Sequence, residues 1–95
     1  MNETPEWERL LDEIHAIADE QETDIVLLDG YGEAVIGYGS ISGEGHTRVI
    51  YSVTKIIEIL MERDGMDKDE AVEFFEFNIL GLGGLGPGSP MLCEQ

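Results

Sequence analysis

The stretch that decides the fold is Thr47-Arg48-Val49-Ile50-Tyr51-Ser52-Val53-Thr54-Lys55-Ile56-Ile57-Glu58-Ile59-Leu60-Met61. It is decisive because the spacing of its apolar side chains changes at Ser52. Residues 47–51 predict a strand, since β-branched and aromatic side chains dominate them. After Ser52 the apolar side chains recur at helical spacing, namely Val53, Ile56, Ile57, Leu60 and Met61. Ser52 is a typical helix N-cap, and Gly65 predicts the end of this helix. The stretch therefore predicts an α+β fold in which a strand runs directly into a helix.

Two further helices are predicted on either side of this stretch. Thr4-Pro5-Glu6 is a typical start, with Thr4 as cap, and helical spacing continues to Glu20 through Trp7, Leu10, Leu11, Ile14, Ile17 and Ala18. Downstream, Asp67 and Glu70 form a capping-box pattern. The helix that follows carries Ala71, Val72, Phe74, Phe75, Phe77 and Ile79. Because its apolar arc covers most of its circumference, we expect it to be the most buried of the three.

Two more strands are predicted upstream of the central stretch, over residues 24–29 and 33–39. Asp29-Gly30-Tyr31-Gly32 lies between them and predicts a hairpin turn. Loops this short favour antiparallel neighbours, so we expect a three-stranded antiparallel meander. The predicted order is α-β-β-β-α-α in a single domain over residues 1–95, with a glycine-rich tail from Gly81.

The charge of the chain is strongly negative and unevenly distributed. Twenty-one acidic residues face five basic ones, for a net charge of -16, and residues 3–22 and 58–76 carry eight acids each. Such a surface repels nucleic acid phosphates and anionic lipids, so we expect no direct nucleic acid binding and a protein partner with a basic surface. The candidate acidic contact surface consists of Glu8, Asp12, Glu13, Asp19, Glu20, Glu58, Glu62, Asp69, Glu73 and Glu76.

The remaining composition bounds the environment of the protein. No apolar run approaches the roughly 20 residues that span a membrane, and the N-terminus lacks the pattern of a signal peptide. Cys93 is the only cysteine, so no intramolecular disulfide can form and a cytoplasmic location is expected. Phe74, Phe77 and Met61 offer apolar surface that could close a homodimer.

No motif supports catalysis or cofactor binding. Residues 81–86 match the letters of a dinucleotide fingerprint, but a helix precedes them where the motif needs a strand. The acids at Asp64, Asp67, Asp69 and Glu70 do not have the alternate spacing of a calcium loop. His15 and His46 lack partners for a metal site, and no base accompanies the serines at positions 40, 42, 52 and 89. We therefore predict a protein that is not an enzyme and uses no cofactor or metal.

Two structural hypotheses concern polar and aromatic residues. Asn78 projects from the apolar face of the last helix, where a buried amide needs partners. We expect it to tie the tail near Gly81 to the domain; the alternative is an asparagine at the end of the helix. Tyr31, Tyr38 and Trp7 form either part of the core, which we favour, or an exposed aromatic patch for a partner.

The second half of the chain resembles a known group of proteins. Four segments resemble small acidic proteins of bacteriophages, prophages and mobile elements: Lys55 to Glu62, Asp64-Gly65-Met66, Glu70-Ala71 and, most specifically, Glu73-Phe74-Phe75-Glu76-Phe77-Asn78. The resemblance covers about residues 24–90 and implies no catalytic residue. It implies a C-terminal strand, but residues 81–90 lack the aromatic residue that the group has there. Whether the tail pairs as a strand is therefore left open.

These observations favour a non-enzymatic acidic interaction protein. In a phage context its partner would be a nucleic-acid-binding host protein, for which a row of carboxylates imitates the charge of a duplex. The alternative is an accessory protein whose acidity is an adaptation to high salt, consistent with only two lysines, Lys55 and Lys68. A small metal-dependent enzyme is the third and least favoured interpretation.

Overall fold

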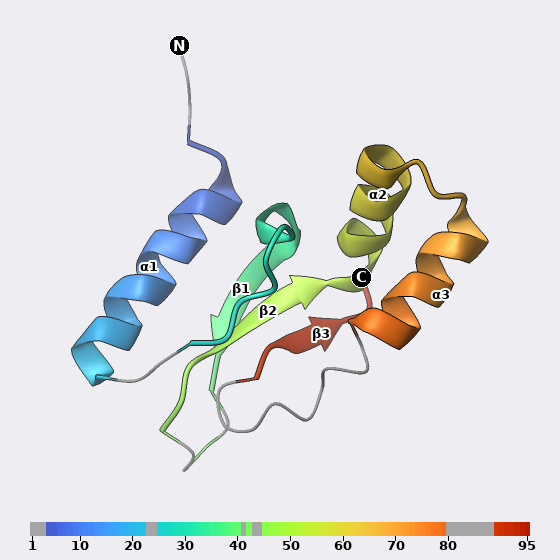
Figure 1. Cartoon of the computed structure of the whole chain (residues 1–95). Coiled ribbons are helices and arrows are strands. Elements are labelled where there is room, and N and C mark those ends of the chain that lie inside the picture. Colours follow the sequence, from blue (N-terminus) through green and yellow to red (C-terminus); the bar gives the residue numbers. More distant parts are fainter. Residues whose placement is uncertain (1–3, 23–24, 41, 43–44, 80–88) are drawn as a thin grey trace.

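The computed structural model describes residues 4–22, 25–40, 42, 45–79 and 89–95. Over these residues the chain forms a small α+β domain with three α-helices and a three-stranded mixed sheet (Figure 1). The order is α1 (Glu6–Gln21), the 3-10 helix η1 (Gly32–Ala34), β1 (Val35–Gly39), β2 (Arg48–Ser52), α2 (Val53–Asp64), α3 (Lys68–Asn78) and β3 (Met91–Cys93). The predicted α+β class is confirmed, whereas the predicted order of strands is wrong.

The sheet is built around β2 and is not an antiparallel meander. β1 pairs with β2 in antiparallel register from Val35 opposite Tyr51 to Gly39 opposite Arg48, with an irregularity between Val35 and Gly37. β3 pairs with β2 in parallel, with Met91 opposite Ile50. Parallel neighbours need a long crossover, which α2 and α3 supply by carrying the chain away from the sheet before it returns. The C-terminal strand is therefore present, and the order is α-β-β-α-α-β.

The segment predicted as the first strand does not join the sheet. Residues 25–28 have no regular secondary structure, and residues 23 and 24 lie outside the described residues. The backbone N–H of Leu28 donates to the Tyr51 hydroxyl at 2.9 Å instead of to a strand. The predicted turn is present, because Gly30 has φ +89° and the Tyr31 N–H donates to the Leu28 carbonyl at 3.1 Å. It leads into η1 and not into a hairpin.

Local helix signals account for two of the three helices. The Lys55 N–H donates to Ser52 Oγ at 3.2 Å, so Ser52 caps α2 as predicted. Gly65 ends α2 in the left-handed region, with φ 68°. Asp67 and Glu70 form the predicted capping box of α3. Thr4, in contrast, does not cap α1, because Pro5 occupies the N-cap position and no side chain bonds to the first turn.

The core lies between the sheet and the helices. α1 contributes Ile14, and α2 contributes Ile56 and Leu60; β2 adds Val49 and Tyr51. In Figure 1, α1 lies beside β1 at one end of the molecule, and α2 and α3 lie at the other, past the end of β2. Tyr31, Tyr38 and Trp7 are half-buried and pack against this core, as favoured from the sequence.

The expectation that α3 is the most buried helix is wrong. α3 buries only Ala71 and Phe75, and each of the other helices also buries two residues. The Phe77 side chain is 78% exposed. The reason is that α3 packs mainly against α2, beyond the end of the sheet (Figure 1), so one face of an apolar helix stays uncovered.

Hydrogen bonds hold β3 in place at both of its ends. Arg48 Nη1 donates to the Ser89 carbonyl at 2.9 Å, just before β3 begins. After β3, the Gln95 carbonyl accepts from the Thr54 N–H at 3.2 Å and from the Ser52 hydroxyl. Ser52 thus serves both the cap of α2 and the end of β3.

Candidate interaction surface

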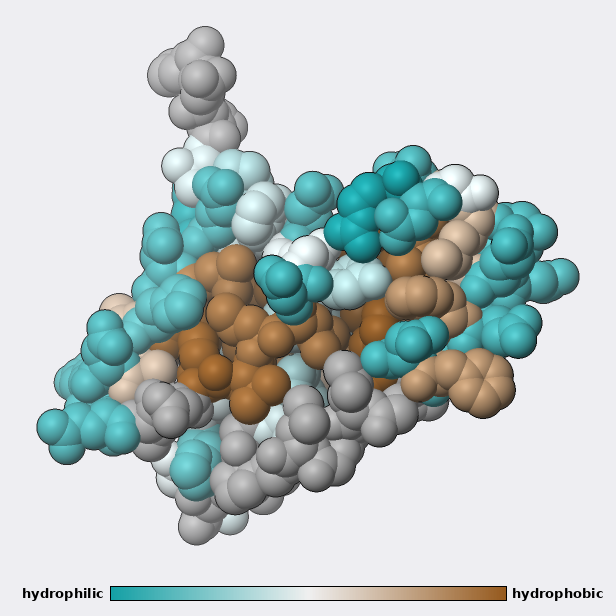
Figure 2. All heavy atoms as spheres, viewed as in Figure 1, coloured by the Kyte–Doolittle hydropathy of each residue, from teal (hydrophilic) through white to brown (hydrophobic). Residues whose placement is uncertain are grey.

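All ten residues of the predicted acidic contact surface are exposed. They do not form one surface. Five lie on α1 and five on α2 and α3, which Figure 1 shows at opposite ends of the molecule. In Figure 2 hydrophilic side chains cover both sides, and a hydrophobic band lies between them. The structure therefore separates the candidate residues into an α1 group (Glu8, Asp12, Glu13, Asp19 and Glu20) and an α2–α3 group (Glu58, Glu62, Asp69, Glu73 and Glu76).

Within the α1 group, Glu13 has a described partner. The Tyr38 hydroxyl donates to Glu13 Oε2 at 3.2 Å. This hydrogen bond raises the pKa of Tyr38, and desolvation and the charge of Glu13 act in the same direction. The contact fixes β1 against α1 and leaves the other oxygen of Glu13 available to a ligand.

Arg63 is occupied by the fold and does not neutralise the α2–α3 group. Its guanidinium donates to the Gly30 carbonyl at 2.7 Å, lies 3.4 Å from Asp64 Oδ1 and stacks 5.1 Å from the centroid of the Tyr31 ring. The hydrogen bond to Asp64 raises the pKa of Arg63. The arginine therefore ties α2 to the turn before η1.

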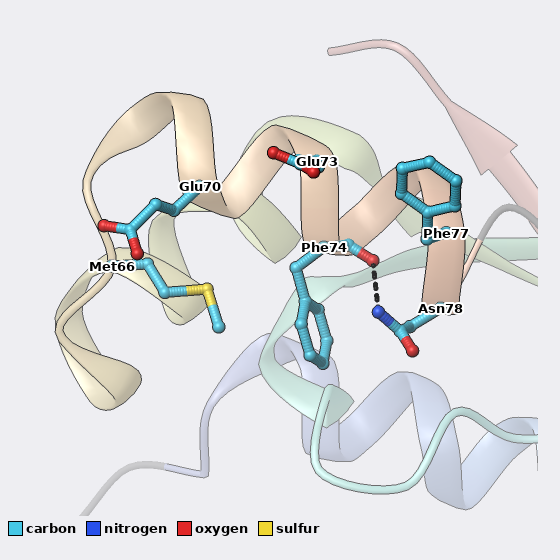
Figure 3. Close-up of a pocket in the computed structure, with 6 residues that line it drawn as sticks. All are labelled: Met66, Glu70, Glu73, Phe74, Phe77 and Asn78. Carbon is cyan, nitrogen blue, oxygen red and sulfur yellow. Dashed lines mark hydrogen bonds between the residues drawn. The ribbon is translucent and has the colours of Figure 1, made fainter.

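A shallow hollow of about 330 Å³ opens on α3 (Figure 3). Phe74, Phe77 and Met66 supply its apolar surface, and Glu70 and Glu73 supply its carboxylates. One oxygen of Glu70 accepts from the Asp67 N–H at 3.2 Å, so this carboxylate is partly used by the capping box. The hollow offers apolar contact beside negative charge, but most of that charge comes from one helix face.

Asn78 lines the same hollow and is not the buried amide that the sequence predicts. Its side chain is exposed, and Nδ2 donates to the Phe74 carbonyl of its own helix at 3.1 Å (Figure 3). It also does not occupy the C-cap position, which belongs to Ile79. Gly81 and the rest of the predicted contact with the tail lie outside the described residues.

A second concave region, which was not predicted from the sequence, lies between α1, η1 and α2. It consists of two hollows, of about 310 and 260 Å³, that share Trp7 and Lys55. We call it the Trp7 groove. Apolar side chains line it, chiefly Trp7, Leu10, Ile36 and Ile59, and so do four carboxylates, Glu6, Glu33, Glu58 and Glu62. Only Glu58 and Glu62 belong to the predicted set.

The local packing of Trp7 explains why the groove is hard to predict. A Cβ atom at Gly32 would lie 3.0 Å from Trp7 Cζ3, so the indole packs closely against η1 and a larger residue 32 would displace it. The groove is assembled from positions about 25 residues apart along the chain. Trp7 is the one signal in the sequence, where an aromatic patch with Tyr31 and Tyr38 is the less favoured alternative to a role in the core.

The described residues offer no metal centre. No group of three or more His, Cys, Asp or Glu side chains among them could hold a metal ion. His15 is exposed, His46 is half-buried, and Cys93 is a free, half-buried cysteine on β3. Residues 81–86, which resemble the dinucleotide fingerprint, lie outside the described part of the chain. None of the described helices has the length and apolar character needed to cross a membrane.

Comparisons with known proteins add no assignment. No protein-family model, no curated protein and no solved structure matches this chain.

Proposed function

We propose that this chain is a non-enzymatic interaction protein that binds a protein partner through basic side chains of that partner. The observation that carries the proposal is that the carboxylates of the α2–α3 group are accessible to a ligand. All five carboxylates are exposed, and no side-chain hydrogen bond or ion pair occupies them within the described residues. Carboxylates in this state are available to Lys and Arg, and their field speeds the encounter with a basic partner.

The charge density of α2 and α3 suggests the class of partner. Residues 58–76 carry eight acids against Arg63 and Lys68. α2 has 12 residues and is about 18 Å long. Because α3 packs beside it, this pair of helices carries seven acids, or about one per 3 Å of its length, against one charge per about 1.7 Å of duplex DNA. A nucleic-acid-binding protein is therefore the first partner class to test, and the resemblance to phage proteins favours a host protein of this kind.

The position of α1 limits this comparison. α1 carries six acids over its 16 residues, or about one per 4 Å. In Figure 1 most of α1 lies at the other end of the molecule from α2 and α3, and only its first turn approaches α2, where Glu6 and Lys55 line one hollow, so most of its charges do not extend their row. Imitation of a duplex is thus proposed for the α2–α3 group alone, and the α1 group contributes long-range attraction.

Adaptation to high salt is the second candidate. Exposed carboxylates on both sides of the molecule and the scarcity of lysine favour it. In that case self-repulsion at low ionic strength should unfold the domain below about 0.5 M salt. An interaction protein should stay folded there, so circular dichroism across a salt series separates the two candidates.

A pull-down from bacterial lysate with matched baits tests the proposal. One bait is wild type, one has the α2–α3 group replaced by Gln and Asn, and one has the α1 group replaced in the same way. Both variants lose five charges, so bulk charge is equal. We expect the wild-type bait to capture a basic protein that added salt elutes. The α2–α3 variant should retain much less of this protein than the α1 variant. Retention that salt does not affect, or no retained protein, would contradict the proposal.

A further inference from the structure

The Trp7 groove joins an apolar floor to carboxylates from three separate elements. Glu6 comes from α1, Glu33 from η1, and Glu58 and Glu62 from successive turns of α2. Elements this far apart along the chain converge only through the fold. The groove is therefore different from the hollow on α3, where Glu70 and Glu73 are neighbours on one helix.

The electrostatics of the Trp7 groove are one-sided. Four carboxylates and one ammonium, that of Lys55, line it, which leaves a charge of about −3 near neutral pH. No hydrogen bond or ion pair among the described residues occupies these carboxylates. Beside low-dielectric apolar walls such charges act more strongly on a ligand than isolated surface acids.

Trp7 gives the groove a recognition element as well as apolar area. The indole packs against Gly32 on one side and lines both hollows, so part of it faces the ligand space. A tryptophan face attracts the guanidinium of Arg or the ammonium of Lys. Tryptophan is also, with tyrosine and arginine, one of the residue types enriched among those that dominate the energy of protein interfaces.

We infer that the Trp7 groove binds a segment of a protein partner in which Arg or Lys alternates with apolar side chains. The basic groups stack on Trp7 and pair with Glu58, Glu62, Glu33 and Glu6, and the apolar groups contact Leu10, Ile36 and Ile59. Charge complementarity selects this occupant over a second copy of the chain, whose net charge of -16 would oppose it. The inference rests on the proposed function and assigns it a place on the molecule.

Trp7 is the only tryptophan, so its fluorescence reports occupancy of the groove directly. The probe is a synthetic peptide of alternating Arg and Leu, labelled for anisotropy as a second readout, and compared with an oligo-Arg peptide of equal charge. The groove variant is Glu58→Gln/Glu62→Gln. The matched control is Asp12→Asn/Asp19→Asn on α1, which removes the same charge outside the groove.

We expect a saturable change in Trp7 fluorescence with the Arg–Leu peptide and weaker binding of oligo-Arg. Because exposed charge pairs contribute modestly, the groove variant should lose about three- to tenfold in affinity and the control less than twofold. Lys55→Gln should bind about twofold tighter, because it removes the one opposing charge in the groove. Circular dichroism verifies that each variant is folded.

Three other outcomes overturn the inference in distinguishable ways. In the first, peptide anisotropy saturates while Trp7 fluorescence does not change, and both double variants lose the same affinity. This result places the contact outside the groove and leaves the proposed function standing. No saturable binding by either readout at low salt contradicts the inference and the proposed function together. A fluorescence change that follows protein concentration without peptide assigns the groove to a second copy.

Discussion

Tyr51→Phe is the substitution that best isolates one interaction of this fold. Tyr51 lies on the central strand with a side chain that is 1% exposed. Its hydroxyl accepts from the Leu28 N–H at 2.9 Å, which is the described bond that holds the extended segment 25–28 against β2. The substitution removes one oxygen atom and leaves the ring in place, so packing changes little.

The expected loss follows from the amide that is left behind. An unpaired buried donor costs about 1–3 kcal/mol, and Leu28 is half-buried, so we expect a loss of about 1–2 kcal/mol in the free energy of unfolding. For a domain of this size that corresponds to a fall in Tm of about 5–10 °C. Urea unfolding followed by circular dichroism and by Trp7 fluorescence measures it, and the m-value should not change.

Tyr38→Phe is the matched control, because it also removes one hydroxyl. The Tyr38 bond to Glu13 is exposed, so the urea midpoint of Tyr38→Phe should stay near that of wild type. Equal midpoints for Tyr51→Phe and wild type would refute the reasoning, since the Leu28 amide would then have found water or another acceptor at no cost.

The same tyrosine gives the stability a defined dependence on pH. Burial raises the pKa of Tyr51 above its usual value of 10.0, and this outweighs the opposite effect of the bond from Leu28. The unfolded chain therefore loses this proton first as the pH rises. The contribution is complete below pH 10.0 and is lost as the pH increases through the folded-state pKa. Tyr51→Phe should lose stability less steeply there than wild type, and parallel curves would contradict the assigned burial.

Four further substitutions test the helices. Glu22 holds a left-handed conformation, with φ 56°, at the negative end of α1, so Glu22→Gly should stabilise the domain by about 1 kcal/mol. Gly65→Ala, at φ 68°, should destabilise it for the same reason, that only glycine adopts a positive φ without strain. A loss of stability in both variants would disprove this reason. Asp67→Ala should cost about 1 kcal/mol by removing the cap of α3, and thermal melts check this. Phe77→Ser should leave Tm nearly unchanged, because the ring is 78% exposed; a large drop would mean that the ring is covered in solution.

The parts of the fold that the sequence predicts correctly depend on neighbours within a few residues. Ser52 caps α2 by accepting from the amide three residues ahead, and Gly65 ends this helix. Asp67 pairs with Glu70 within the first turn of α3. Each is a short-range hydrogen bond or a backbone preference, so the sequence alone contains the cause. The α+β class follows from the same local patterns.

The incorrect predictions of strands depend on tertiary competition. Residues 25–28 are apolar enough for a strand, but the Tyr51 hydroxyl takes the Leu28 amide and β3 occupies the free edge of β2. β3 has only three residues, too few for a propensity signal, and its position is fixed by Arg48 and the Gln95 carbonyl. Competition for one edge of a strand cannot be read from either segment alone.

The candidate site divides in the same way. Exposure of the ten acids could be predicted, because helical spacing places them opposite the apolar stripes. The Trp7 groove could not, because Glu6, Glu33 and Glu58 meet only after α1, η1 and α2 have packed. The apolar arc of α3 misled for a related reason: a wide arc indicates a buried face only when a second element covers it.

The most direct test of the central claim, that the acidity forms a contact surface, is a chemical-shift titration of the ¹⁵N-labelled protein with the Arg–Leu peptide at physiological salt. We predict that the largest shifts cluster at Trp7, Glu33, Glu58 and Glu62, saturate together, and diminish as salt rises. Small shifts spread evenly over both acidic groups, without saturation, would contradict the claim and identify the carboxylates as a solubilising surface.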